Sequence, residues 1–356
     1  MAPWSPGDRV VVLGAGATRG AEFVEQHNPI CLPPLNMDFF TQLQRVATKK
    51  HQETINAVLK DVRRVYGVNY RVSLEQYVTQ LESLRTITDL VPVANDAYTA
   101  EGLDAMRRRL LNALSAVLEE SADVAKQTSI AVKHPCGYHR ALAQALRPKD
   151  TVITFNYDCV MDDALRRWAP GHWSAQYGYC FPNPGRVQGH EVWSAKDPPT
   201  EQNRTVNLLK LHGSLNWRPL PESDSAPIRL RERPYKQKGD KEYELVPPEN
   251  SKQLDGRPVL QKLWGNAERA IRRAKVIALV GFSFTPTDLH VDSLFRVALA
   301  GNKRLKLVVI VNPDPDHRRA IRAVFATQLA RDIRLVQFDR LSQFSSHVDD
   351  LLNDFV

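Results

Sequence analysis

The sequence predicts an α/β fold in which a doubly wound parallel sheet carries a large helical insertion. Three observations predict it. Short apolar runs rich in β-branched residues recur along the chain, helical patterns alternate with the later runs, and a long stretch between the first two runs shows helical spacing only. The length of 356 residues fits two domains, or one domain with an insertion.

Six apolar runs are the expected strands of the sheet. Each is almost continuously apolar, which is typical of parallel strands that are covered on both faces. The runs span residues 9–13, 151–155, 206–211, 276–280, 305–311 and 335–338, with helical patterns at 268–274, 289–300 and 316–329. This alternation predicts a Rossmann-like domain made of residues 1–36 and 147–340.

The insertion is expected over residues 37–146, where apolar residues recur at three- and four-residue spacing. Its helices are predicted at 38–65, 74–84, 104–124 and 138–146. A stretch rich in Pro and charge, residues 219–258, is expected to form a mobile excursion or a short hairpin. The C-terminal segment, residues 341–356, is expected to form an amphipathic helix.

The composition excludes some classes of protein but identifies no binding partner. The net charge is 48 − 40 = +8, and the basic residues are dispersed, so binding to nucleic acid is left open. No secretory leader and no apolar run of membrane-spanning length is visible, which predicts a cytoplasmic protein without membrane contact. The four cysteines, Cys31, Cys136, Cys159 and Cys180, include no C-x-x-C pair and are expected to be reduced, buried thiols with no metal.

A glycine-rich loop follows the first strand directly. Its sequence is Gly14-Ala-Gly-Ala-Thr-Arg-Gly20, and glycine lets backbone N–H groups approach a pyrophosphate near a helix start. The dinucleotide fingerprint G-x-G-x-x-G would need glycine where Arg19 stands, and no second strand with a terminal acid follows. The loop therefore indicates a dinucleotide site, or a tight strand exit with no ligand.

Polar clusters follow four further strands. They are Thr154-Phe-Asn-Tyr-Asp158, His212-Gly-Ser-Leu-Asn-Trp217, Gly281-Phe-Ser283 and Asn312-Pro-Asp314. Any one of them is compatible with an ordinary cap or turn. Because ligands of open α/β sheets bind beyond the carboxyl ends of the strands, we expect the clusters to converge on one site with Gly14 and Gly16.

These motifs resemble those of the sirtuin fold, and most closely those of the sirtuin-like NAD-consuming effectors of bacterial antiviral defence. Sirtuins carry G-A-G-I-S, T-Q-N-I-D, L-H-G-S, G-T-S and I-N segments in this order. The chain has Gly14-Ala-Gly-Ala-Thr18, Thr154-Phe-Asn-Tyr-Asp158, Leu211-His-Gly-Ser214, Gly281-Phe-Ser283 and Val311-Asn312. The resemblance extends from residue 9 to about residue 320.

The resemblance implies a site residue by residue. Gly14, Ala15, Gly16 and Thr18 would hold the phosphates and nearby ribose of NAD, and Gly281, Ser283 and Asn312 would hold the adenosine half. Asn156 and Asp158 would line the nicotinamide-ribose pocket, with Asn156 orienting water and His212 as the general base, since an imidazole can take a proton near pH 7. Asp38, Tyr157 and Asp288 are further candidates whose contact with ligand the sequence leaves open.

Departures from the sirtuin pattern bear on which molecule is the acceptor when NAD is cleaved, and on which other proteins the chain works with. The four-cysteine zinc module of protein deacylases is missing, because residues 215–273 contain no cysteine, so no zinc is expected. The segment Cys31-Leu-Pro-Pro-Leu-Asn-Met-Asp-Phe-Phe40 resembles the defence effectors, which favours water as the acceptor. About 40 residues follow Ala320, which leaves no room for a sensor domain. We therefore expect a homo-oligomer or control by a separate partner, such as a HerA-type ATPase.

The sequence predicts an NAD glycohydrolase (NADase) that cleaves NAD+ to nicotinamide and ADP-ribose and depletes NAD when activated. Two alternatives stay open. One is an NAD-dependent protein deacylase or ADP-ribosyl transferase, and the other is a non-catalytic subunit that binds NAD or ADP-ribose in an assembly. A metal-dependent nuclease is less well supported, because the lone pair Asp288 and Asp292 is typical of a helix start.

Overall fold

The computed structural model describes residues 4–91, 95–122, 136–169, 171–219, 228–232, 244–245, 257–285 and 288–353. Its main sheet has six parallel strands in the order β10-β9-β8-β1-β2-β3. Their bounds are β1 Arg9–Leu13, β2 Thr151–Thr154, β3 Asn207–Lys210, β8 Val276–Val280, β9 Leu307–Val311 and β10 Arg334–Phe338. Numbered along the chain, the order reads 3-2-1-4-5-6, as in Rossmann folds, with its reversal between β1 and β8. The predicted doubly wound α/β fold is confirmed.

The strand register aligns the last residues of all six strands with one another. Leu13 pairs with both Thr154 and Val280, and these are the last residues of their strands. The same alignment continues outward, from Thr154 to Lys210 and from Val280 through Val311 to Phe338. All segments that leave the carboxyl ends of the strands therefore start at one edge of the sheet, as the sequence analysis expected.

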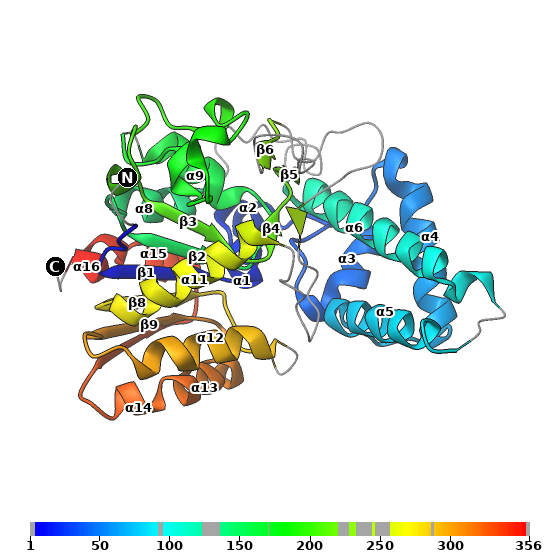
Figure 1. Ribbon diagram of the computed structural model, residues 1–356. Coiled ribbons are helices and arrows are strands. Elements are labelled where there is room, and N and C mark those ends of the chain that lie inside the picture. Colours follow the sequence, from blue (N-terminus) through cyan, green and yellow to red (C-terminus); the bar gives the residue numbers. More distant parts are fainter. Residues whose placement is uncertain are drawn as a thin grey trace. The chain divides into compact units, whose positions relative to one another are not determined.

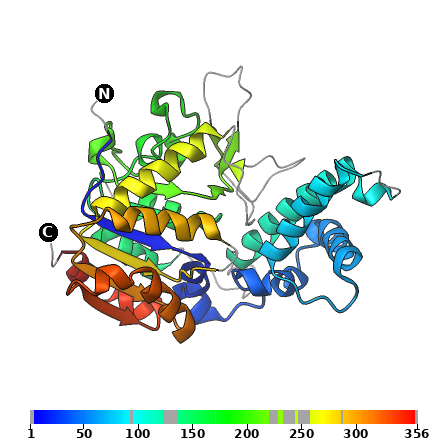
Figure 2. The ribbon, with the colours of Figure 1, turned by 60° about the horizontal axis from the view of Figure 1, so that its bottom comes forward.

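Helices cover both faces of this sheet (Figures 1 and 2). On one face, α8 (Gly137–Ala145) packs against α9 (Val160–Trp168), α15 (Leu341–Ser345) and α16 (Val348–Asn353). On the other, α11 (Pro258–Arg273) packs against α12 (Leu289–Ala300), which contacts α13 (Pro315–Val324). Because β1, β8 and β9 are buried along their whole length, their residues are apolar except for Arg9 at the start of β1.

The chain divides into two compact units, one of residues 1–26, 133–245 and 253–356 and the other of residues 27–132 and 246–252. The second unit is helical. Its helices are α3 (Phe39–Arg45), α4 (Gln52–Tyr66), α5 (Leu74–Thr88) and α6 (Ala100–Ala122), and α6 contacts each of the other three. The domain bounds predicted from the sequence stay a prediction.

Several predicted helices need correction. The single helix predicted over residues 38–65 is wrong, because the backbone is extended at Val46 and Thr48 and separates α3 from α4. The helix predicted at 268–274 begins ten residues earlier, with Pro258 in its first turn, where proline is favoured. Residues 316–329 form two helices, α13 and α14 (Ala326–Leu329), which meet at Phe325. In the C-terminal segment the structure likewise has two helices, α15 and α16, and residues 354–356 lie outside the described part.

Short elements complete the fold. The helices α1 (Ala15–Arg19), α2 (Glu22–His27) and α10 (Ala175–Gly178) were not predicted. Two small antiparallel pairs join β4 (Gly213–Ser214) to β7 (Glu244–Leu245) and β5 (Trp217–Pro219) to β6 (Ile228–Leu230). Single 3-10 turns lie at Asn36–Asp38, Lys49–His51, Asp96–Tyr98, Pro184–Arg186, Glu191–Trp193 and Gln202–Arg204.

Most of the predicted excursion at 219–258 lies outside the described residues. No helix in the described ranges is both long and apolar enough to cross a membrane.

Candidate functional site

Three glycines pack together at the reversal of the strand order. The N–H of Gly14 donates to the carbonyl of Val280 at 3.1 Å, and the N–H of Gly16 donates to that of Gly281 at 2.9 Å. A Cβ on Gly14 or Gly16 would lie 2.6 or 2.7 Å from the Gly281 oxygen, and a Cβ on Gly281 only 2.0 Å from the Ala17 nitrogen. The glycines thus have a packing role, and the phosphate contact predicted for Gly14, Ala15, Gly16 and Thr18 stays a prediction.

Gly281→Ala is expected to lower the free energy of unfolding by at least about 2 kcal/mol and to displace the glycine-rich loop. The φ angle of Gly281 is +56°, and the new methyl group would meet backbone on both sides. The matched control is Gly265→Ala on the exposed face of α11, where a Cβ meets nothing within 4 Å. Alanine at position 265 is expected to raise stability slightly, because it favours helix. Thermal unfolding of both variants checks this pair, and equal melting temperatures would contradict it.

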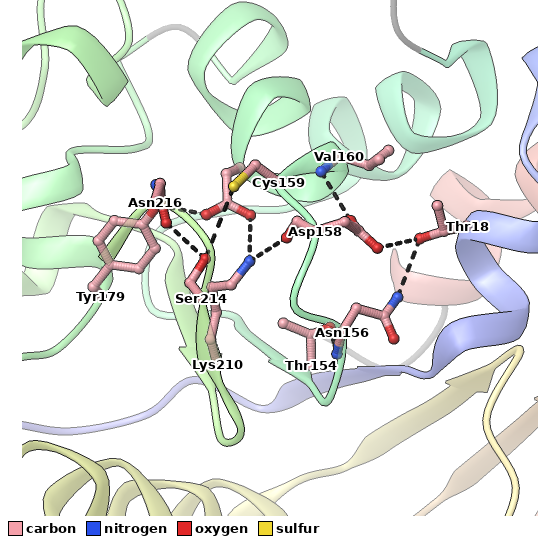
Figure 3. Close-up of polar contacts among 11 residues, drawn as sticks. Thr18, Thr154, Asn156, Asp158, Cys159, Val160, Tyr179, Lys210, Ser214 and Asn216 are labelled. Atoms are coloured by element: carbon pink, nitrogen blue, oxygen red, sulfur yellow. Dashed lines mark hydrogen bonds and ion pairs between the residues drawn. The ribbon is translucent and has the colours of Figure 1, made fainter. Parts of the chain in front are cut away.

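The Asn156 side chain is held against the glycine-rich loop. Its Nδ2 donates to the carbonyl of Gly14 at 2.9 Å. It also donates to Oγ1 of Thr18 at 3.2 Å, as Figure 3 shows. A carbonyl oxygen only accepts hydrogen bonds, so it fixes the orientation of the amide. The acceptor atom Oδ1 is therefore the part of Asn156 that can receive a hydrogen bond from a water or a sugar hydroxyl.

Asp158 anchors the same turn. Its Oδ2 accepts a hydrogen bond from the Thr18 hydroxyl at 2.8 Å, and its Oδ1 accepts one from the N–H of Val160 at 3.0 Å, at the start of α9. The carboxylate is buried. It therefore links the loop after β1 to the turn after β2, and its predicted contact with the nicotinamide ribose stays a prediction.

His212 lies just beyond the end of β3 and is 6% exposed. Its ring contacts the rings of Phe155 and Tyr157, with centroid distances of 5.1 and 6.0 Å. These are the two neighbours of Asn156 in the chain, so the turn after β2 and the turn after β3 adjoin. The backbone before His212 is fixed too, because Trp264 Nε1 donates to the carbonyl of Leu211 at 3.0 Å.

Asp288 is the charged group beside His212. Its Oδ2 lies 3.6 Å from Nε2 of His212, while its Oδ1 accepts the N–H of Val291 and caps α12. The expectation of a helix-start charge is thus confirmed. The carboxylate would also stabilise the imidazole ring when it takes up a proton.

For the nicotinamide release that the sequence predicts, Asp288→Asn is expected to lower kcat about tenfold, which corresponds to about 1.4 kcal/mol. Asparagine keeps the size and the cap but removes the negative charge next to the protonated ring. The control is Asp292→Asn on the same helix, where the carboxylate pairs with the exposed Arg296. Steady-state kinetics of both variants measure the difference, and an unchanged kcat in Asp288→Asn would contradict a role for this charge.

The two remaining predicted residues lie at the ends of β8 and β9. Asn312 is tied to the backbone at both ends of its side chain, since Nδ2 donates to the carbonyl of Phe282 at 2.9 Å and Oδ1 accepts the N–H of Asp314 at 3.0 Å. Ser283, next to Phe282, is half-buried. Asn312 therefore fixes the turn that carries Ser283, and contact of either with adenosine stays a prediction.

The structure brings the predicted residues of the first unit to one edge of the sheet, whereas Asp38 lies in the second unit. There its carboxylate accepts hydrogen bonds from the N–H of Leu35 and from the Gln42 side chain. A buried ion pair of Lys210 and Asp162, next to Asp158, was not predicted from the sequence. A lysine in the predicted buried strand at residues 206–211 was the available signal.

Of the four cysteines, Cys159 directly follows Asp158, and its Sγ lies 3.8 Å from Oγ of Ser214. All four are buried and free of disulfides, as predicted. Within the described ranges, no three His, Cys, Asp or Glu side chains are grouped so as to hold a metal ion.

One protein family matches this sequence. The family is described as SIR2-like domain, and the match covers residues 150–330, slightly more than half of the chain. The chain belongs to the SIR2-like domain family. The matched part of the SIR2-like domain contains Asn156, Asp158, His212, Gly281 and Asn312.

Solved structures resemble the whole chain more distantly. A Sir2 homologue in complex with NAD is 15% identical, covers 97% of this chain and 88% of its own, and has a TM-score of 0.41. A variant Sir2 homologue in complex with ADP-ribose is 14% identical, covers 96% and 89%, and has a TM-score of 0.38. No curated protein matches the SIR2-like chain.

Proposed function

We propose that the protein is an NAD glycohydrolase, which cleaves NAD+ to nicotinamide and ADP-ribose and serves as an NAD-depleting effector of antiviral defence. The observation that carries the proposal is the position of Asn156. Its amide is oriented by Gly14 and Thr18 at the reversal of the strand order, and its two chain neighbours contact the ring of His212. An oriented acceptor and an imidazole thus come from adjoining turns at the edge where such sheets bind ligands.

The chemistry follows from these two groups. The bond between the ribose C1′ and the nicotinamide nitrogen breaks, and its electron pair stays with nicotinamide. Water attacks C1′, and Oδ1 of Asn156 accepts a hydrogen bond that orients it. His212 takes the proton that the water loses, and Asp288 stabilises the resulting charge. Gly14, Ala15, Gly16 and Thr18 would contact the phosphates, with Gly281, Ser283 and Asn312 on the adenosine side.

The experiment is incubation of the purified protein with NAD+, with free nicotinamide and ADP-ribose followed by chromatography. Hydrolysis predicts equal amounts of both products without any peptide. Nicotinamide release only in the presence of an acylated peptide would instead indicate the deacylase alternative. NAD+ binding with no release, alone or with a candidate partner, would indicate the non-catalytic alternative and would overturn the proposal.

Control by assembly belongs to the same proposal. We propose that the chain acts as a homo-oligomer or together with a partner such as a HerA-type ATPase. Size-exclusion chromatography combined with the nicotinamide assay tests this idea. A stable monomer with full activity would contradict it.

A further inference from the structure

A buried polar cluster lies next to the turn that carries Asn156 and Asp158 (Figure 3). The ammonium group of Lys210 donates to Oδ2 of Asp162 at 2.9 Å and to the backbone carbonyl of Asp158 at 2.5 Å. The Lys210 and Asp162 side chains are 1% and 0% exposed. Lys210 thus connects the end of β3 with α9 and with the turn after β2.

Hydrogen bonds extend this cluster past His212. Tyr179 donates to Oδ1 of Asp162 at 2.5 Å, and Nδ2 of Asn216 donates to the Tyr179 hydroxyl at 3.0 Å. Ser214 in turn donates to Oδ1 of Asn216 at 2.6 Å. We call these five residues, Lys210, Asp162, Tyr179, Asn216 and Ser214, the Lys210 network.

The pKa values of Lys210 and Tyr179, two members of the Lys210 network, are both raised. Burial alone would lower the pKa of Lys210, but the attraction of Asp162 outweighs it and leaves the pKa above its usual value. Burial, together with the charge of Asp162, raises the pKa of Tyr179 far above its usual value. Lys210 and Tyr179 therefore remain hydrogen-bond donors across the physiological pH range.

Stability alone does not account for such a network. Removing two charges from water is unfavourable, and well-packed apolar residues in place of a buried ion pair often stabilise a protein as well or better. What the network does provide is a fixed geometry. Lys210 binds the backbone carbonyl of Asp158, two residues after Asn156. Lys210 itself lies two residues before His212, and Ser214 and Asn216 lie two and four residues after it.

We propose that Lys210 is a positioning residue, which with Asp162 and Tyr179 holds the turns of Asn156 and His212 in the geometry that the reaction requires. The inference rests on the proposed function, which it deepens. Lys210 touches no substrate in this account, and it acts through the Asp158 carbonyl and through the strand that leads into His212.

The test is the double variant Lys210→Met/Asp162→Asn, which removes both charges with side chains of similar size and leaves no unpaired ion. The matched control is Arg9→Met/Asp150→Asn. Arg9 and Asp150 also form a buried ion pair, with 4% exposure on each side, but at the amino ends of β1 and β2. Two readouts are used: kcat and KM per folded molecule, and amide hydrogen exchange of segments 155–159 and 211–216 measured by mass spectrometry.

The proposal predicts that Lys210→Met/Asp162→Asn lowers kcat at least tenfold, changes KM less than threefold, and speeds exchange in both segments at least tenfold. The control is expected to leave kcat, KM and exchange in these segments unchanged, whatever its effect on the melting temperature. Wild-type kcat in the folded Lys210 variant, or unchanged exchange in the two segments, would overturn the proposal.

Tyr179→Phe serves as the milder second variant if the double variant does not fold. It removes only the hydroxyl group that joins Asp162 to Asn216, and it is expected to lower kcat about threefold or more with little change in KM. Wild-type kcat in Tyr179→Phe would then overturn the proposal. If the wild-type protein itself releases no nicotinamide, the proposed function fails, and hydrogen exchange alone decides whether the network holds the two turns.

Discussion

His212→Ala is expected to lower the rate of nicotinamide release at least about 10²-fold, the usual loss when a general base is removed. The ring lies beside Asp288 and contacts the two aromatic residues that flank Asn156. One carboxylate oxygen of Asp288 caps α12, and the other lies 3.6 Å from Nε2 of His212. Chromatography of nicotinamide at saturating NAD+ measures the effect.

The matched control for this variant is His347→Ala, at an exposed position close to the C-terminus. It is expected to keep full activity. Circular dichroism and thermal unfolding should show that both variants are folded. Nicotinamide release by His212→Ala at the rate of His347→Ala would remove His212 from the mechanism.

Asn156→Ala is expected to lower nicotinamide release to a similar degree, by about 10²-fold or more. The substitution removes the acceptor Oδ1, and it also frees the carbonyl of Gly14 and the hydroxyl of Thr18 from their present partner. Asn156→Asp separates these two effects, because it keeps an acceptor oxygen but cannot donate to Gly14. We expect Asn156→Asp to be impaired as well, since the carboxylate would face the Gly14 carbonyl.

Asn56→Ala, on an exposed position of α4, is the control for the Asn156 variants. It is expected to behave as wild type in nicotinamide release and to be at least as stable, because alanine favours helix. Full activity in both Asn156 variants would show that water is positioned by another group, and the proposed mechanism would be wrong.

Much of the sheet was predictable because its residues carry a strong local signal. The run at β8 is apolar throughout, the run at β1 is apolar after Arg9, and the predicted bounds of both agree with the structure. Strand order could not be read from any single run. The polar clusters at strand ends nevertheless predicted a common edge, and the aligned last residues of the six strands explain why this inference worked.

Helix bounds were harder to predict, for identifiable reasons. The break between α3 and α4 has no proline or glycine, so periodicity alone ran through it. The early start of α11 was marked by Pro258, but the surrounding Pro- and charge-rich stretch favoured an irregular structure there. The short helix α1 has five residues, too few to show a helical period.

Part of the candidate site was predictable from the sequence, and part depends on tertiary packing. Asn156 and His212 stand out in the sequence, because each follows a predicted strand and belongs to a recognisable motif. The proximity of Asp288 to His212, and that of Lys210 to Asp162, depend on tertiary packing between segments separated by dozens of residues. The sequence left Asp288 open as a ligand contact and gave no reason to pair Lys210 with α9.

The most direct test of the central claim is a crystal structure of the slow His212→Ala variant with NAD+. The claim is that the loop at residues 14–18, the amide of Asn156 and the side chain at position 212 surround one ribose carbon. We predict that C1′ of the nicotinamide ribose lies where a water held by Oδ1 of Asn156 is within about 3.5 Å of it, with position 212 facing the same carbon. NAD+ bound elsewhere, or with its nicotinamide ribose away from Asn156, would contradict the claim.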